Sequence, residues 1–130
     1  MKIILLIGLP GSGKTTWVKS QDLGPKDLFI DDIKDLSQIY PGKIPADTTM
    51  LYIADPHLCN DRTRRKAHDV LELYYPAVEI LYVFWKNDLH AAWKNILKRN
   101  DGRVISRPWL QSLSLQYNPP LDALIIQQEP

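Results

Sequence analysis

The residues best suited to chemistry form the run Gly8-Leu9-Pro10-Gly11-Ser12-Gly13-Lys14-Thr15, directly after the apolar run of residues 2–7. Glycines let backbone N–H groups turn inward around phosphate oxygens, and a lysine at this spacing reaches the β- and γ-phosphates. The Thr15 hydroxyl is placed to bind Mg²⁺. This pattern predicts a P-loop that binds a nucleoside triphosphate with magnesium. The predicted nucleotide-binding residues of the loop are Gly8, Pro10, Gly11, Ser12, Gly13, Lys14, Thr15 and Thr16.

Two further acidic positions follow apolar segments. Asp31 and Asp32 end a predicted strand over residues 27–30, and Asp55 ends a buried strand over residues 50–54. The carboxyl ends of parallel strands meet at one edge of a sheet, where such enzymes place their ligand-binding residues. An alternative for Asp31 is that it caps a helix over residues 32–39. Asp55 is expected to orient either Mg²⁺-bound water or the catalytic base.

His57 and Cys59, close to Asp55 in the sequence, are not expected to bind a metal. His57 is expected to make a local hydrogen bond. A zinc site is not expected, because neither residue has partners at metal-ligand spacing.

Basic residues gather later in the chain. Residues 61–107 carry ten bases and six acids, whereas residues 21–55 carry seven acids and three bases. Arg62, Arg64, Arg65 and Lys66 crowd the first turns of a predicted helix over residues 61–75, which indicates either an anionic contact or a solvated basic face. Residues 98–108 form a second basic segment before a helix that starts near Pro108.

The opening MKIILLIGLPGSGKTTW resembles the phage-type polynucleotide 5′-hydroxyl kinases and their small P-loop kinase relatives. The segment FIDDIK is similar to their strand-end Asp followed by a basic residue. In that family the Asp accepts the proton of the attacking hydroxyl and the basic residue binds the acceptor's phosphate. The resemblance thus implies that Asp31 is the general base and Lys34 the acceptor-phosphate ligand, although those kinases typically have Arg there.

The basic segment 98–108 resembles the lid of P-loop kinases, whose arginines close over the triphosphate. The run Lys98-Arg99-Asn100 followed by Arg103 matches the family, and Arg107 corresponds by position only. At residue 55 only the Asp of the family's Asp-x-Asn sequence is present. The loop motif, the resemblance and the charge pattern together predict three groups of functional residues. They are the catalytic set Asp31, Lys14, Arg99 and Arg103; the acceptor-binding set Lys34, Asp32, Arg64 and Arg65; and the metal-binding pair Thr15 and Asp55, with Arg99, Arg103 and Arg107 also contacting the nucleotide. Arg64 and Arg65 are included for their charge and their position after the third predicted strand, not for the resemblance.

These residues need a scaffold, and the hydrophobic pattern predicts one. Strands are predicted over residues 2–7, 27–30, 50–54, 78–85 and 121–126, with helices over 14–20, 61–75, 88–98 and from 108 onward. Alternating strands and helices indicate a three-layer α/β P-loop NTPase fold with a five-stranded parallel sheet, and the resemblance implies strand order 2-3-1-4-5. The predicted core positions of the last two helices are Leu89, Trp93, Ile96, Leu97, Trp109, Leu110, Leu113 and Tyr117.

Length and composition limit the number of domains, the kinds of partner and the compartment that we expect. The chain has 130 residues, 45% of them hydrophobic, and we expect one domain over residues 1–130. The formal net charge of +1 gives no overall nucleic-acid signature. Cys59 has no partner for an internal disulfide, and the apolar start is too short for a signal peptide, so we expect a cytoplasmic protein that does not contact a membrane.

Together these features lead us to expect an ATP- and Mg²⁺-dependent kinase whose acceptor is a hydroxyl of a nucleic acid, most simply the 5′-hydroxyl of a polynucleotide. The short loop 41–48 leaves the acceptor side open, which favours a large acceptor. Three alternatives remain open. They are a kinase of hydroxymethylated bases in DNA, a kinase of a small nucleoside or metabolite, and a catalytically inactive nucleotide-binding module.

Overall fold

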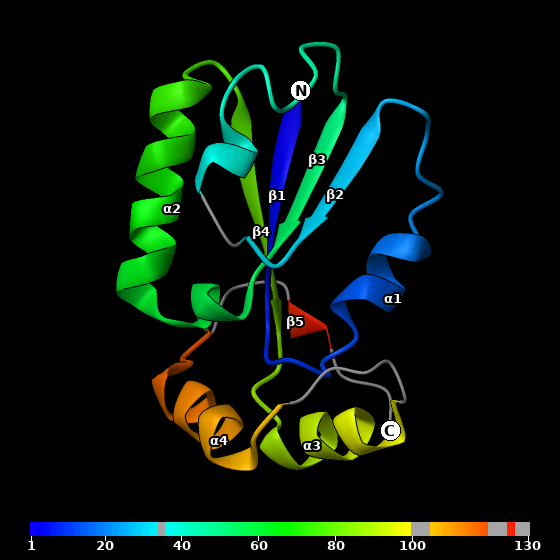
Figure 1. Ribbon diagram of the computed structural model, residues 1–130, viewed down its shortest axis with the longest axis vertical. Helices are drawn as coiled ribbons and strands as arrows, with labels where there is room; N and C mark the ends of the chain where they lie inside the picture. Colours follow the sequence, from blue (N-terminus) through cyan, green and yellow to red (C-terminus); the bar gives the residue numbers. More distant parts are fainter. Residues whose placement is uncertain (34–35, 100–104, 120–124, 127–130) are drawn as a thin grey trace.

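A parallel β-sheet runs through the middle of the molecule (Figure 1). The structure is a computed structural model that describes residues 1–33, 36–99, 105–119 and 125–126. The four full-length strands lie in the order β2-β3-β1-β4, as the resemblance implied, and the two-residue β5 pairs with the end of β4. The strands are β1 (Lys2–Ile7), β2 (Asp27–Asp31), β3 (Met50–Ala54), β4 (Glu79–Trp85) and β5 (Ile125–Ile126). A parallel α/β sheet is thus confirmed, but residues 121–124 of the fifth predicted strand lie outside the described residues.

The helices begin where side chains can bond to free backbone N–H groups. Asn60 accepts from the N–H of Thr63, Asp88 from that of Ala91, and Ser106 from that of Trp109. These caps explain why the helix starts were predictable to within a residue or so. The helices are α1 (Lys14–Lys19), α2 (Asp61–Tyr74), α3 (Leu89–Lys98) and α4 (Arg107–Gln116), with 3-10 turns η1 (Leu36–Ile39) and η2 (Pro56–Cys59).

The helix considered over residues 32–39 does not begin at Asp32. This residue has a φ of 57°, in the left-handed region, and its N–H donates to the carbonyl oxygen of Ala54 on β3 (2.8 Å). Only the short η1 is helical among the described residues of this stretch. Asp31 therefore does not cap a helix that starts at Asp32.

The two faces of the sheet carry separate hydrophobic clusters. Ile3, Leu5 and Ile7 of β1 point to the face covered by η1, α2, α3 and α4, whereas Ile4 and Leu6 point to the face covered by α1. This alternation is the period of two expected for a strand that is buried on both faces. The sheet and its two helical coverings form the predicted three layers.

Two predicted core positions are wrong. Leu97 is 66% exposed and Trp109 is 37% exposed. Consecutive helical residues are rotated by about 100°, so Leu97 lies off the face that its neighbour Ile96 packs against the core. Trp109 lies at the start of α4, beside the functional site described below.

The strand register brings the carboxyl ends together. Leu6 of β1 is level with Ala54 of β3, and Ala54 is level with Asp31 of β2. The residues that follow these strands therefore emerge at the same edge of the sheet, in the middle of the molecule and above α3 and α4 in Figure 1. In the described part of the chain, no helix has the length and apolar character needed to cross a bilayer.

Candidate active site

The segment between β1 and α1 forms a tight loop, as the sequence predicts. Gly11 and Gly13 have φ values of 83° and 94°, a conformation that residues with a Cβ rarely adopt. Gly13 is also the N-cap of α1, and its carbonyl oxygen accepts the first helical hydrogen bond, from the N–H of Trp17 (3.0 Å). The backbone N–H groups of the first turn of α1 consequently lie next to the loop, where they favour an anion.

Lys14 is buried inside this loop, with 8% of its surface exposed. Its Nζ donates to the carbonyl oxygens of Gly8 (2.5 Å) and Leu9 (3.0 Å), and it lies 3.5 Å from the Ser12 hydroxyl. Burial lowers the pKa of Lys14 to about 8, and the negative charge of Asp31 acts in the opposite direction. Lys14 is thus a buried cation that gives up its proton at a lower pH than an exposed lysine would.

Helix α3 fixes the loop from outside. The Asn95 side-chain amide donates to the carbonyl oxygen of Gly11 (2.9 Å). A Cβ at Gly11 would lie 2.5 Å from the carbonyl oxygen of Ala92 and 2.9 Å from Cγ1 of Ile96. Sequence reasoning missed Asn95, because an asparagine inside a helical pattern carries no signal of a contact 84 residues away.

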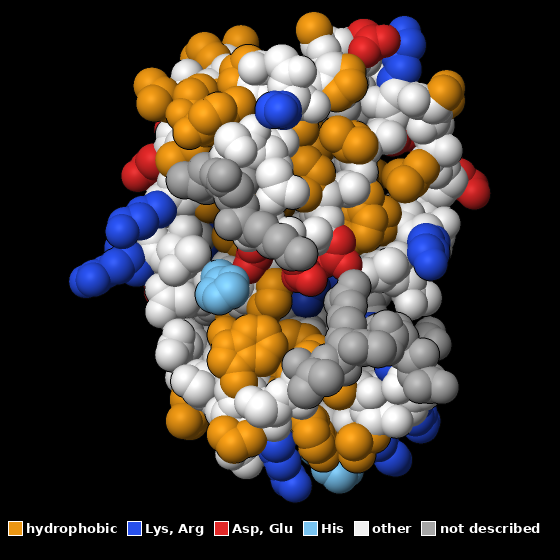
Figure 2. Space-filling view, in the orientation of Figure 1, with side chains coloured by type: hydrophobic (Ala, Val, Ile, Leu, Met, Phe, Trp, Pro, Cys, Tyr) orange, Lys and Arg blue, Asp and Glu red, His pale blue; other side chains and the backbone are white. Residues whose placement is uncertain are grey.

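A small cleft joins the loop to two of the other predicted residues. Its lining comprises Asp31 at the end of β2, Arg99 at the C-cap of α3, and the loop residues Pro10, Gly11, Ser12, Gly13, Lys14 and Thr15. Three segments that are distant in sequence therefore line one space beside the loop. Figure 2 shows acidic side chains gathered in a hollow in the middle of this face, with a histidine and a hydrophobic patch at its border.

Asp55 connects the ends of β2 and β3. Its Oδ2 accepts from the N–H of Ile33 (3.0 Å), and its Oδ1 accepts from the N–H of His57 (2.8 Å). His57 Nδ1 also lies 2.9 Å from Oδ1, which is the local hydrogen bond expected for this histidine. Asp55 is 7% exposed and is not among the described residues that line the cleft. These contacts position the turn that follows Asp31.

The oxygen donors beside the loop suit Mg²⁺. The Thr15 hydroxyl lines the cleft, and Mg²⁺ binds one or two protein oxygens together with phosphate oxygens and water. Asp55, whose two carboxylate oxygens already accept hydrogen bonds, suits the orientation of a metal-bound water more than direct ligation.

The basic residues of α2 do not form a single group. The Arg64 side chain is 12% exposed, donates to the carbonyl oxygen of Leu58 (3.0 Å), pairs with Asp61 and lies 5.2 Å over the Phe84 ring. In contrast, Arg62, Arg65 and Lys66 are exposed. Arg64 and Arg65 line a separate cavity between α2 and β4, so the structure does not bring them together with Asp31.

The remaining predicted site residues are not among the described residues that line the cleft. Asp32 follows β2 in the left-handed turn, and Thr16 is exposed on α1. Arg107 lies 5.8 Å over the Trp93 ring, where it joins α4 to α3. Lys34, Asn100 and Arg103 lie outside the described residues, as does the middle of the predicted lid, residues 100–104.

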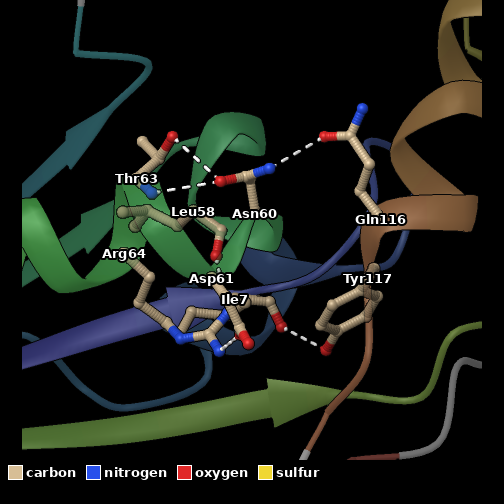
Figure 3. A network of polar contacts seen from close by, with 8 residues as sticks. All are labelled: Ile7, Leu58, Asn60, Asp61, Thr63, Arg64, Gln116 and Tyr117. Carbon is tan, nitrogen blue, oxygen red and sulfur yellow. Dashed lines mark hydrogen bonds and ion pairs between the residues drawn. The ribbon is translucent and has the colours of Figure 1, made fainter.

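Helix α4 is attached to the strand ends by polar contacts, part of which Figure 3 shows. The buried Tyr117 hydroxyl donates to the carbonyl oxygens of Ile7 and Trp85, at the ends of β1 and β4. Asn60, at the start of α2, donates to Gln116 (3.1 Å). Helix α4 is thereby held next to the end of β1, where the phosphate loop begins.

Comparisons with known proteins support the fold. No known family model matches the chain. It is 28% identical to the uncharacterized protein R277 of Acanthamoeba polyphaga mimivirus over 106 residues, which is 78% of this chain and 75% of that protein. Its structure is similar to the crystal structure of a gluconokinase from Sinorhizobium meliloti 1021, with a TM-score of 0.62, 15% identity, and coverage of 99% of this chain and 84% of that one. The chain therefore shares the overall fold of that gluconokinase structure, an α/β fold with a parallel sheet.

Proposed function

We propose that the protein is an ATP- and Mg²⁺-dependent kinase that transfers the γ-phosphoryl group to a hydroxyl. The observation that carries this proposal is the cleft in which the phosphate loop, Asp31 and Arg99 line one space. Phosphoryl transfer needs a cradle for the triphosphate, a carboxylate for the attacking hydroxyl and cations for the developing charge. The cleft supplies all three from different segments of the chain.

In the proposed reaction, the Asp31 carboxylate accepts the proton of the acceptor hydroxyl. A bond forms between that oxygen and the γ-phosphorus, and the bond from the γ-phosphorus to the bridging oxygen breaks, which releases ADP. Lys14 turns from the carbonyl oxygens of Gly8 and Leu9 toward the phosphates, and Arg99 adds a second positive charge. Arg103 and Arg107 are proposed to assist from the lid.

Mg²⁺, when bound, would neutralise charge between the β- and γ-phosphates. Thr15 would ligate it, and Asp55 would orient one of its waters. Asp55 also has a second role in this proposal, because its bond to the N–H of Ile33 fixes the backbone two residues after Asp31.

For the acceptor we propose the 5′-hydroxyl of a polynucleotide. Support comes from the resemblance of the FIDDIK segment to the polynucleotide kinases, in which Lys34 and Asp32 would contact the acceptor. The exposed cations Arg62, Arg65 and Lys66 on α2 would attract the phosphates of a long acceptor. We do not include Arg64 among these acceptor-binding cations, because its largely buried guanidinium already bonds to Asp61 and to the Leu58 carbonyl oxygen.

The test is transfer of labelled γ-phosphate to oligonucleotides that carry a 5′-hydroxyl. Asp31→Asn should retain ATP affinity and lower the transfer rate by roughly 10²–10⁴-fold, the usual contribution of a general base. Asp32→Asn tests which of the two adjacent carboxylates is the base: Asp32 is proposed to contact the acceptor but is not among the described residues that line the cleft, so its loss should raise the KM for the oligonucleotide and lower the transfer rate much less. If Asp32→Asn shows the larger loss, the assignment of the base to Asp31 is wrong.

A kinase of a small metabolite is the second candidate, and the likeness to a gluconokinase structure favours it. The two candidates are separated by adding gluconate, free nucleosides and DNA with hydroxymethylated bases to the same assay. Faster transfer to gluconate or a nucleoside than to any oligonucleotide would replace the polynucleotide proposal. Binding of ATP without transfer to any acceptor would indicate an inactive nucleotide-binding module.

A further inference from the structure

Two aromatic rings lie together close to the Asp55 carboxylate. The centroids of the His57 and Trp109 rings are 6.4 Å apart, with an angle of 58° between the planes. Both rings reach solvent, because the His57 side chain is 67% exposed and Trp109 is 37% exposed. The next residue on α4, Leu110, is fully buried, so the start of this helix presents one apolar side chain to the core and the Trp109 ring to solvent.

The His57 ring is held at a fixed place relative to the proposed base. Asp55 Oδ1 contacts both the N–H and Nδ1 of His57, while Asp55 Oδ2 accepts from the N–H of Ile33. Ile33 is two residues after Asp31. One buried carboxylate thus connects the exposed ring to the turn that carries the candidate catalytic residue.

Trp109 is held by the attachment of its helix. The backbone N–H of Trp109 donates to the Ser106 hydroxyl at the N-cap of α4, and Tyr117 at the other end is bonded to the ends of β1 and β4. The bond between Asn60 and Gln116 fastens α4 to the segment that contains His57. Both rings are therefore presented by anchored elements, which lowers the entropy lost when a flat ligand binds.

We propose that the exposed Trp109 ring, with the tilted His57 ring beside it, is a stacking surface for the base of the acceptor's terminal nucleotide. This inference rests on the proposed function and specifies its substrate class, because a sugar acid has no aromatic face to stack. Base–aromatic stacking tolerates any base, so the surface fits an enzyme that modifies polynucleotide ends without regard to sequence. His57 follows β3 and contacts the Asp55 carboxylate, and the Trp109 ring lies against His57. Asp55 also bonds to the turn after Asp31, the residue proposed to take the proton of the acceptor hydroxyl, so we assign the two rings to the acceptor instead of the adenine of ATP.

The first test compares two oligonucleotides that differ only in the 5′-terminal nucleotide, one with a base and one abasic. Trp109→Ala should raise the KM for the base-bearing oligonucleotide about 10-fold and leave the KM values for the abasic one and for ATP unchanged. Trp109→Phe keeps an aromatic face and should restore most of the affinity. Leu115→Ala, on the same helix and 84% exposed, is the matched control and should change none of these values. Equal effects of Trp109→Ala on both oligonucleotides, or a rise in the KM for ATP alone, would overturn the proposal.

A second measurement does not depend on turnover. Stacking should quench the fluorescence of Trp109 when the base-bearing oligonucleotide is added together with a non-hydrolysable ATP analogue, and Trp109→Phe should abolish that part of the signal. Quenching without any phosphoryl transfer would support the stacking surface and reject the proposed reaction. Transfer without quenching would leave the reaction in place and reject the stacking surface.

Discussion

Lys14 is the residue whose environment most directly determines how the site would respond to pH. Its side chain is buried, and burial lowers its pKa to about 8, from an ordinary value of 10.5. Phosphate oxygens favour the charged form, so a bound triphosphate raises this pKa again. Binding above pH 8 then requires the uptake of a proton.

We expect ATP affinity to fall as the pH rises from 8 to about 9.5, by up to about tenfold per pH unit. The sign follows from the two states: the free protein loses the Lys14 proton near pH 8, whereas the complex keeps it. Calorimetric titrations in two buffers of different ionisation enthalpy should show proton uptake that approaches one per ATP at pH 9.5. In Lys14→Gln the affinity should be weak and independent of pH over this range. A constant affinity of the unmodified protein from pH 7 to 9.5 would show that Lys14 is not the group involved.

The sequence alone predicted only part of the set of residues that form the candidate active site. The phosphate loop was predictable because its chemistry depends on residues that are adjacent in sequence. The meeting of Asp31 with Arg99 depends on the register of the strands and on the position of α3, and only the resemblance pointed to it. The internal position of Arg64 was not predictable, because an amphipathic pattern does not show which arginine of a basic run packs against an aromatic ring.

Among the elements, β3 was predicted with its observed bounds, and α2 and α3 to within one residue at each end. These segments have local signals: an apolar run, a side-chain cap or a regular helical face. The stretch after Asp31 was not predictable in the same way. The left-handed turn at Asp32 is stabilised by a backbone bond to Ala54, and the next residue is bonded to Asp55, so its conformation depends on a neighbouring strand.

The packing of α3 on the phosphate loop gives a prediction at the scale of elements. Gly11→Ala should lower the free energy of unfolding by about 2–4 kcal/mol and weaken ATP binding, because the new Cβ meets the backbone of α3 at Ala92. Urea denaturation and ATP titration would measure both effects. Gly42→Ala is the matched control, since Gly42 has a similar φ of 98° but no atom within 4 Å of its added Cβ.

Gly42→Ala should cost only the backbone strain, about 1 kcal/mol, and leave ATP affinity unchanged. The difference between the two variants isolates the contact between loop and helix. Equal losses of stability in both variants, with normal ATP binding by Gly11→Ala, would mean that α3 does not determine the shape of the loop.

For the whole molecule, the distribution of charge is more informative than its total. The formal net charge is only +1, yet acidic side chains gather in the central hollow, while Lys and Arg side chains project from the side where α2 lies (Figures 1 and 2). A long acceptor could place its terminal hydroxyl at the hollow and its following phosphates along these cations. The acidic centre and the basic flank would then act on different parts of one substrate.

We therefore expect the rate of oligonucleotide phosphorylation at low substrate concentration to fall as salt rises. The triple variant Arg62→Ala/Arg65→Ala/Lys66→Ala should reduce the steepness of that fall by up to about 2 in a plot of log(kcat/KM) against log salt, since each phosphate contact of a single strand contributes about 0.7. The KM for ATP should not change. A substrate too short to reach α2, such as a dinucleotide, should show little salt dependence with either protein.

Arg64→Ala separates this electrostatic effect from a structural one. Arg64 is a neighbour of the three exposed cations in sequence, but it bonds to the Leu58 carbonyl oxygen and covers the Phe84 ring. Its removal should lower the free energy of unfolding by about 1–3 kcal/mol and leave the salt dependence of kcat/KM nearly unchanged. The triple variant should show the reverse, with normal stability and a reduced slope. If Arg64→Ala has normal stability but a weaker salt dependence of kcat/KM, the Arg64 side chain must leave its contacts with Leu58 and Phe84 and bind the acceptor.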